Sequence, residues 1–219
     1  MSISTWLEKA QQVAGPAGLL DLRVGEHEGA PTEELKCGFI MCHPHPLFSG
    51  TMDNKVVTTL VRGAAQLGLD TLRFNFRGVG ESKGEHDQGV GEQDDLAAVV
   101  EYAMQELGWN KIYLAGFSFG SGIACLYAGS HPEQIAGLFL VAPAVHHFDA
   151  PAMLPFEFET HVYMGDADEV VPFDEVEHWV DLLTPQPHFH IFEQTSHFFH
   201  GKLVVLKNTV MEDLRALLP

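Results

Sequence analysis

Gly116-Phe117-Ser118-Phe119-Gly120 decides the fold, because it stands between an apolar run, Lys111–Ala115, and a stretch compatible with a helix. The G-x-S-x-G spacing is typical of a sharp turn from a strand into a helix, with the serine at the turn. A turn this tight brings backbone atoms together, so a β-carbon at either glycine would clash. The pattern predicts that the Ser118 hydroxyl stands above the edge of a sheet, at the start of the next helix.

Strands and helices are expected to alternate along the rest of the chain. The expected strands are Leu19–Val24 (at an edge), Lys36–Cys42, Asp70–Phe76, Lys111–Ala115, Ala136–Ala142, Thr160–Met164 and His188–Phe192. The expected helices are Asn54–Leu67 (with Asp53 as N-cap and Gly68 as stop), Asp94–Leu107, Asp174–Leu183 and Leu203–Leu218. This order predicts the α/β class, with a doubly wound, mostly parallel sheet and helices on both faces. No repeat or long linker divides the chain, so residues 1–219 are expected to form a single domain.

The composition restricts the classes of partner. The chain has 219 residues, of which 46% are hydrophobic, and 30 acidic against 12 basic residues give a net charge of −18. Binding to nucleic acid or to an anionic membrane needs a basic surface. We therefore expect no nucleic acid and no membrane among the partners.

Three cysteines, Cys37, Cys42 and Cys125, lie in apolar surroundings without the spacing of a zinc site or a redox pair. They are expected to be buried free thiols, as in a reducing compartment. Residues 1–15 do not have the pattern of a signal peptide, and no run of 18 apolar residues occurs. A cytoplasmic location is the resulting expectation.

An acid and a histidine follow two later strands. Asp168 comes after the strand that starts at Thr160, and His197 comes after His188–Phe192. In open α/β sheets, ligands bind beyond the carboxyl ends of the strands, where both residues and Ser118 are expected. Serine needs a histidine to take its proton, and that histidine needs a carboxylate to fix its tautomer. The sequence therefore predicts a catalytic group of Ser118, Asp168 and His197.

Other residues compete for these roles. Asp166 is a second candidate for the acid, two residues before Asp168. His43 and His45 could share a metal ion, but no third ligand stands at a suitable spacing, and we expect neither a metal nor a cofactor. His146, His147 and His200 could also be ligands or bases, and each is expected to be structural or peripheral.

The chain resembles the α/β-hydrolase superfamily from about Leu19 to Leu218. Four segments carry the resemblance: Gly116–Gly120, Gly165–Asp168, the segment around His197, and the loop Phe76–Ser82. More narrowly, His43-Pro44-His45-Pro46 and the following residues to Lys55 resemble a bacterial subgroup of small, dienelactone-hydrolase-like predicted hydrolases. That subgroup usually has two glycines where Ser49 and Gly50 stand, and true dienelactone hydrolases use cysteine where this chain has Ser118.

The resemblance also implies an oxyanion hole made of backbone N–H groups. In the superfamily one N–H comes from the residue after the nucleophile, here Phe119, and the other comes from the loop that follows Cys42. Pro44 and Pro46 have no N–H, which leaves His45 or Leu47. Counting back from the helix start near Asp53 favours Leu47.

Many superfamily members insert a helical lid after the sixth main strand. Here fifteen residues, His146–Thr160, make this connection, and prolines interrupt it, so a lidless, open site is expected. The segment is apolar, and its side chains could form a wall of an acyl pocket or simply pack onto the domain; they are Phe148, Met153, Leu154, Phe156 and Phe158.

The expected function is that of a serine hydrolase, carboxylesterase-like, which cleaves an ester of a small or short-chain acyl substrate through an acyl-enzyme. A peptidase, thioesterase or acyltransferase would use the same residues, because the catalytic group does not encode the leaving group. A catalytically silent binding or scaffold domain is the alternative from another class. The oligomeric state stays open.

Overall fold

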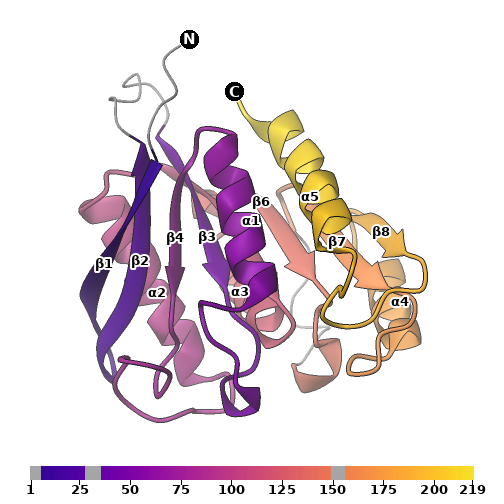
Figure 1. The fold of residues 1–219 in the computed structure, drawn as a ribbon, viewed down its shortest axis with the longest axis horizontal. Helices are drawn as coiled ribbons and strands as arrows, with labels where there is room; N and C mark the ends of the chain where they lie inside the picture. The colour runs from indigo at the N-terminus through magenta and orange to yellow at the C-terminus, as the bar shows by residue number, and fades with distance from the viewer. Residues whose placement is uncertain (1–5, 28–35, 149–155) are drawn as a thin grey trace.

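A twisted eight-stranded sheet runs through the molecule (Figure 1). The computed structural model describes residues 6–27, 36–148 and 156–219. The strand order is β1-β2-β4-β3-β5-β6-β7-β8; β1 and β2 are antiparallel to their neighbours, and the other six strands are parallel. The strands are β1 (Trp6–Gly15), β2 (Gly18–His27), β3 (Cys37–Cys42), β4 (Asp70–Phe74), β5 (Lys111–Phe117), β6 (Ile135–Val141), β7 (Thr160–Gly165) and β8 (His188–Phe192).

Helices cover both faces of this sheet. The helices are α1 (Lys55–Gln66), α2 (Gly91–Gln105), α3 (Phe119–Ser130), α4 (Phe173–Leu182) and α5 (Leu203–Leu217), with short 3₁₀ turns η1 (Pro46–Phe48), η2 (Pro132–Gln134) and η3 (Val145–His147). In Figure 1, α1 and α5 lie side by side in front of the sheet, and α2, α3 and α4 lie behind it. The predicted doubly wound α/β class is thereby confirmed. No helix in the described ranges has both the length and the apolar character that a membrane crossing requires.

The first strand of the sheet was not predicted, and the prediction of an edge strand at Leu19–Val24 was wrong. That segment belongs to β2, which lies between β1 and β4. Most residues of β1 are exposed, and its sequence, WLEKAQQVAG, lacks the apolar alternation of a half-buried strand. The strand forms because it pairs with β2 along its whole length, from Trp6 opposite His27 to Gly15 opposite Gly18.

The start of α1 differs from the prediction by one residue. The side chain of Asn54, rather than that of Asp53, caps the helix by accepting the Val56 N–H at 2.8 Å. Asp53 instead forms an ion pair with Arg73 on β4. Gly68, with φ of +92°, follows the helix as expected for a residue that ends it.

The central strands lie between two layers of helices and are buried on both faces. All residues of β3 and β7 are buried, in agreement with the continuous apolar run that predicted β3. Cys37, Cys42 and Cys125 are buried free thiols, as expected. Burial raises the pKa of the Cys42 and Cys125 thiols, which makes both groups poor nucleophiles.

Candidate active site

Ser118 lies at a strained turn between β5 and α3. Its backbone has φ of +55° and ψ of −116°, and its N–H donates to the carbonyl of Val141 at 2.8 Å. A Cβ at Gly116 would lie 2.3 Å from the carbonyl oxygen of Gly120, and a Cβ at Gly120 would lie 2.5 Å from that of His43. Both glycines are therefore needed for close backbone approach, and together they allow α3 to begin directly against the ends of β3 and β5.

Ser121, a residue that the sequence reasoning missed, holds the same turn from inside. Its hydroxyl contacts the carbonyl oxygens of Gly116 at 2.7 Å and Val141 at 3.0 Å, and its side chain is completely buried. A small hydroxyl residue one turn into a helix that follows a tight turn is the signal that could have found it. The resulting network fixes the position of the Ser118 backbone.

Asp168 and His197 form a buried pair. Asp168 Oδ2 lies 2.7 Å from Nδ1 of His197, while Asp168 Oδ1 accepts the N–H groups of Val170 and Val171, both at 2.8 Å. The Asp168 side chain is fully buried and that of His197 is 3% exposed. Asp166, the competing acid, is exposed. Of the two acids, the structure therefore brings Asp168 to His197.

Backbone contacts hold the loop after β7 against the loop after β8. The Asp166 N–H donates to Phe192 O at 3.1 Å, and the Ala167 N–H donates to Thr195 O at 3.3 Å. A Cβ at Gly165 would lie 2.1 Å from Thr195 O, so only glycine permits this approach. The acid and the histidine are thus held together by their loops as well as by their own hydrogen bond.

Glu169 adds a contact between the same two loops. Its Oε2 accepts the backbone N–H of His197 at 3.1 Å. In the sequence, the only signal for this contact is that Glu169 is adjacent to Asp168. Acidic residues are common in exposed turns, so the sequence does not show whether Glu169 accepts a hydrogen bond or is simply solvated.

His197 also packs against the residue that precedes Ser118. Its ring centroid is 5.0 Å from that of Phe117 and 5.1 Å from that of Phe198. Ser118 and His197 therefore lie at the same edge of the sheet. Among the residues that the structure describes, Ser118 Oγ makes no hydrogen bond, including with His197. The structure thus joins the acid to the histidine directly and leaves the serine beside them.

His43 has a structural role at the end of β3. It is completely buried, and its Nδ1 donates to Pro44 O at 2.6 Å while its Nε2 accepts the N–H of Phe76 at 3.0 Å. Burial lowers the pKa of His43 to about 4, so the ring is neutral at pH 7. Because backbone groups occupy both ring nitrogens, His43 has none left for a metal ion shared with His45.

The two residues that were considered for the second oxyanion donor differ in their hydrogen bonds. The N–H of Leu47, the favoured residue, donates to Nδ1 of His45 at 3.2 Å. Within the described part of the chain, the N–H groups of His45 and Phe119 have no acceptor. Phe119 is the first residue of α3, where backbone N–H groups point away from the helix. The ring centroids of His45 and Phe119 are 4.9 Å apart, so these two N–H groups belong to neighbouring residues.

A pocket of about 730 Å³ opens beside these N–H groups. Its lining is formed by His45, Leu47, Phe48, Glu85, His86, Gln88, Phe119, His147 and Phe148. Burial, with a smaller contribution from neighbouring histidines, lowers the pKa of His45 and of His147. At neutral pH the pocket therefore combines aromatic rings with the uncharged imidazoles of His45 and His147.

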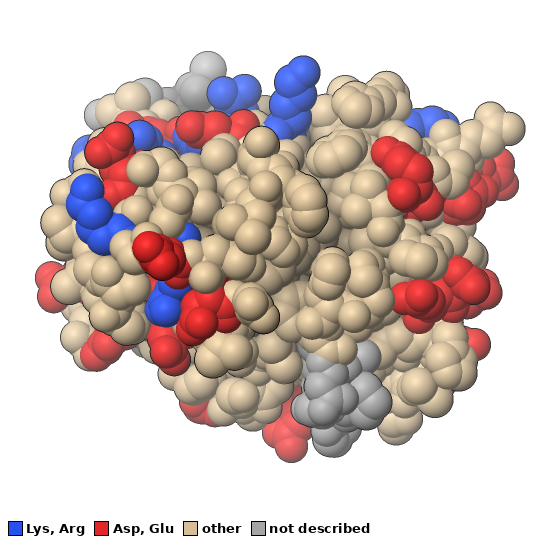
Figure 2. All heavy atoms as spheres, turned by 90° about the horizontal axis from the view of Figure 1, so that it is seen from below, with Lys and Arg blue, Asp and Glu red and all other residues tan. Residues whose placement is uncertain are grey.

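The connection between β6 and β7 contributes one aromatic residue to this pocket. Phe148 lines it, whereas Phe156 is buried in the core and packs against Phe158 with centroids 5.3 Å apart and planes tilted by 31°. Met153 and Leu154 lie outside the described residues. The described part of this connection carries only the 3₁₀ turn η3. Figure 2 shows the end of the molecule where the parallel strands finish: charged side chains flank it on two sides, and its middle is uncharged.

Comparison with known proteins assigns the family. The model of the family described as alpha/beta hydrolase fold matches residues 45–160. The chain belongs to the α/β-hydrolase fold family. A curated relative in this comparison, an uncharacterized protein of Rickettsia prowazekii, is 32% identical over 196 residues, which cover 86% of this chain and 81% of the relative.

Solved α/β hydrolases are similar over almost the whole chain. An alpha-beta serine hydrolase homologue from Coxiella burnetii is 39% identical with a TM-score of 0.87, covering 94% of this chain and 97% of the other. An α/β serine hydrolase without a lid, from Xanthomonas campestris, is 37% identical with a TM-score of 0.87, covering 97% of this chain and 95% of the other. These similarities confirm the α/β-hydrolase resemblance, agree with the lidless fold and support hydrolase activity.

Proposed function

We propose that this α/β hydrolase is a serine carboxylesterase for esters with a small or short-chain acyl group. The observation that carries the proposal is the buried 2.7 Å contact between Asp168 and His197, at the same edge of the sheet as the strained turn of Ser118. Burying a carboxylate–histidine pair and holding a serine at positive φ each cost folding free energy. Nucleophilic acyl transfer needs both features together.

In the proposed reaction, Ser118 Oγ attacks the ester carbonyl and His197 Nε2 takes its proton. Asp168, bonded to Nδ1, keeps the proton-accepting nitrogen directed outward and stabilises the imidazolium. His197 then returns the proton to the leaving alcohol. Water, activated by the same histidine, releases the acyl group from Ser118. The bond from Nε2 to Ser118 Oγ is expected to tighten when substrate is bound, as is common for catalytic hydrogen bonds.

The N–H of Phe119 and the N–H of His45 are the proposed donors to the oxyanion. Both lack an acceptor among the described residues, whereas the Leu47 N–H is engaged by the His45 side chain. The Leu47 assignment favoured on the sequence is therefore replaced by its alternative, His45, in this proposal. Each such donor contributes about 3 to 4 kcal/mol of transition-state stabilisation in serine hydrolases of this kind.

The pocket beside Phe119 supports an uncharged substrate. Its rings suit a short acyl or small aromatic group, and His45 and His147, with pKa values lowered by burial, offer hydrogen bonds without positive charge. The many acidic residues of the chain, with a net charge of −18, disfavour a polyanionic substrate. A small, neutral ester fits both observations.

A fluorophosphonate probe and a series of p-nitrophenyl esters test the proposal. The wild-type protein is expected to be labelled at Ser118 and to hydrolyse the acetate and butyrate esters faster than the dodecanoate. Ser118→Ala is expected to abolish both labelling and turnover. The neighbouring Ser121→Ala is not a suitable control because Ser121 holds the turn, so the exposed Ser49→Ala serves instead. A Ser118→Ala variant with wild-type turnover would remove the assignment.

A further inference from the structure

Histidine and acidic side chains gather on β7 and β8, away from the candidate active site. His161 on β7 is opposite His188 on β8, and Tyr163 is opposite His190. Side chains alternate along a strand, so these four residues project from the same face of the sheet. Helix α5 contributes Asp213 to that face, where its Oδ2 accepts the Tyr163 hydroxyl at 2.7 Å.

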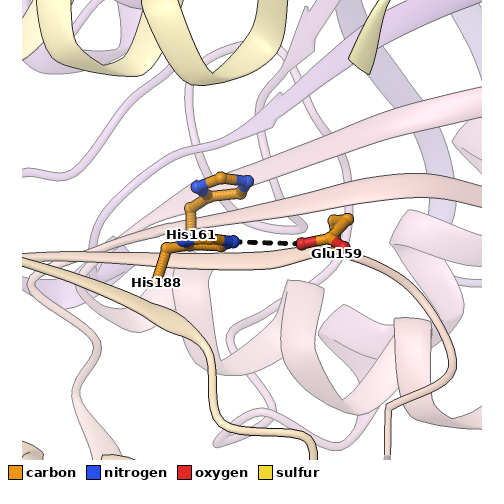
Figure 3. A group of neighbouring side chains, drawn as sticks. All are labelled: Glu159, His161 and His188. Carbon is orange, nitrogen blue, oxygen red and sulfur yellow. Dashed lines mark hydrogen bonds and ion pairs between the residues drawn. The ribbon is translucent and has the colours of Figure 1, made fainter. Parts of the chain in front are cut away.

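The rings in this cluster stack face to face across the strands. His161 stacks on Phe139 of β6, with centroids 5.2 Å apart and planes 5° apart, and on His188, with centroids 4.7 Å apart and planes 14° apart. Figure 3 shows the ring of His161 lying over that of His188, whose Nε2 contacts Glu159 at 3.2 Å. Because imidazole lone pairs lie in the ring plane, stacking fixes the rings and leaves their nitrogens free to bind a ligand.

Several of these nitrogens are buried and have no hydrogen bond among the described residues. Among the described residues, neither Nδ1 nor Nε2 of His161 has a hydrogen bond, and the His161 side chain is only 6% exposed. His190 Nε2 is likewise buried without a hydrogen bond. Both rings nevertheless approach one carboxylate oxygen, since Asp213 Oδ2 lies 3.4 Å from His161 Nδ1 and 2.9 Å from His190 Nε2. Neither approach has the directionality of a hydrogen bond, although buried nitrogens are normally paired.

We propose that His161, His190 and Asp213 bind a divalent transition-metal ion of the Zn²⁺ type. In a tetrahedral zinc site with bonds of about 2.0 to 2.1 Å, neighbouring ligand atoms lie about 3.3 Å apart. The two distances to Asp213 Oδ2, 2.9 and 3.4 Å, are close to that separation. All three ligand atoms lie within 4.8 Å of one another, and water would be the fourth ligand. The planes of the His161 and His190 rings are 14° apart, so the two rings would turn to direct their in-plane lone pairs at one ion.

The protonation and orientation of these residues also suit a metal ion. Burial lowers the pKa of His161, which favours the neutral ring that metals bind. The hydroxyl of Tyr163 orients the carboxylate of Asp213, as partners behind metal ligands commonly do.

The ion would act on the fold rather than on the reaction. His161 is the second residue of β7, and the loop of Asp168 begins after Gly165, four residues further along the strand. At the rise of an extended strand, these four residues span about 13 Å. An ion held by β7, β8 and α5 would therefore fasten the two strands that carry the Asp168 and His197 loops without contacting the substrate.

A second set of ligands shares His161 and can be distinguished by experiment. Glu159, His161 and His188 also place ligand atoms within 4.8 Å of one another. However, the side chains of His188 and Glu159 are 61% and 58% exposed and already contact each other. These two residues satisfy each other at the surface, whereas the buried nitrogens of His161 and His190 have no hydrogen bond among the described residues.

The test is a titration of the full-length protein, first freed of metal by dialysis against a chelator, with ZnCl₂ alone. We expect one strong site per chain by calorimetry and a Zn²⁺-dependent rise in melting temperature. His190→Gln and Asp213→Asn are expected to weaken Zn²⁺ binding at least about tenfold and to remove the rise in melting temperature. Asp213→Asn keeps an acceptor for Tyr163, which guards against simple unfolding.

His188→Gln and His178→Gln, the latter at an exposed residue of α4 outside both ligand sets, are the matched controls, and both are expected to bind Zn²⁺ like the wild type. Co²⁺ substitution gives a second readout, since its visible absorption should change in His190→Gln and not in His188→Gln. Loss of binding in His188→Gln alone would place the ion on the other set and overturn the proposal. Wild-type binding by both His190→Gln and Asp213→Asn would also overturn it.

Discussion

Replacing Asp168 by asparagine tests whether Asp168 Oδ2 sets the tautomer of His197. Asp168 Oδ1 accepts two backbone N–H groups, and Oδ2 contacts Nδ1 of His197. In Asp168→Asn, the amide oxygen must take the place of Oδ1, because an NH₂ group there would face two donors. The NH₂ group is therefore forced into the place of Oδ2 and donates to Nδ1. His197 then carries its proton on Nε2, the nitrogen that should accept the proton of Ser118.

The size of the effect follows from this enforced tautomer. In a serine protease triad the same aspartate-to-asparagine change lowers kcat by about 10⁴ through the wrong tautomer, equivalent to about 5.4 kcal/mol. We expect a similar loss here, because the two N–H donors to Oδ1 exclude the flipped amide that would restore activity. Since the substitution preserves shape, KM for p-nitrophenyl acetate is expected to change little.

The assay is p-nitrophenyl acetate hydrolysis at pH 7.5 by wild type, Asp168→Asn and Asp166→Asn. Asp166 is exposed and two residues away, so its variant is expected to keep wild-type kcat. Circular dichroism and melting temperature check that both variants are folded. If folded Asp168→Asn keeps more than about a tenth of wild-type kcat, the tautomer argument is refuted.

Three further predictions concern the backbone donors, the loop contact and the buried histidine. Proline removes a backbone N–H, and the φ of −54° at His45 suits proline, so His45→Pro should lower kcat about 10²- to 10³-fold relative to His45→Ala. Leu47→Pro should have the same kcat as Leu47→Ala. Equal losses of kcat in the two proline variants would count against His45 as the donor. Gly165→Ala places a Cβ 2.1 Å from Thr195 O and should lower kcat about 10- to 100-fold by separating the two loops, so unchanged kcat in the folded variant would contradict the contact. The pKa of His43 falls from 6.5 to about 4 on folding, so the unfolded chain takes up the proton first and stability decreases as pH falls through this window. Between pH 7 and 4.5, the unfolding free energy of wild type measured in urea should fall about 2 to 3 kcal/mol more than that of His43→Gln, and parallel curves would disprove the shift.

The parallel part of the sheet could be predicted because its strands have continuous apolar runs and its helices have regular apolar faces. The boundaries of β8 were predicted to the residue, His188–Phe192, and those of α5 to within one residue at its end. The turn at Ser118 was predictable for a related reason, since Gly116 and Gly120 are required by backbone contacts that no other residue allows. The apolar patterns and the Gly116 contact are local and therefore visible in the sequence, whereas Gly120 approaches the carbonyl of the distant His43 and was found through the G-x-S-x-G spacing.

Features that depend on contacts between distant residues could not be predicted. Strand β1 has no apolar pattern of its own and exists through its pairing with β2. The occupied N–H of Leu47 depends on the rotamer of His45, and the role of His43 depends on Phe76, thirty-three residues away. The cluster around His161 joins β7, β8 and α5, and two histidines and an aspartate in three separate segments give no signal of it in the sequence. The cytoplasmic location, and the absence of nucleic acid and membranes among the partners, stay predictions.

The proposed base, His197, follows an edge strand of the sheet. β8 is the last strand in the order and pairs with β7 alone, and only Phe192 at its end is buried, whereas β5, which carries Ser118, lies in the middle. Peripheral segments open at a smaller free-energy cost than the whole molecule. On warming, hydrolytic activity should therefore be lost at a temperature where the far-UV ellipticity is still that of the native protein. Cooling from that temperature should restore full activity.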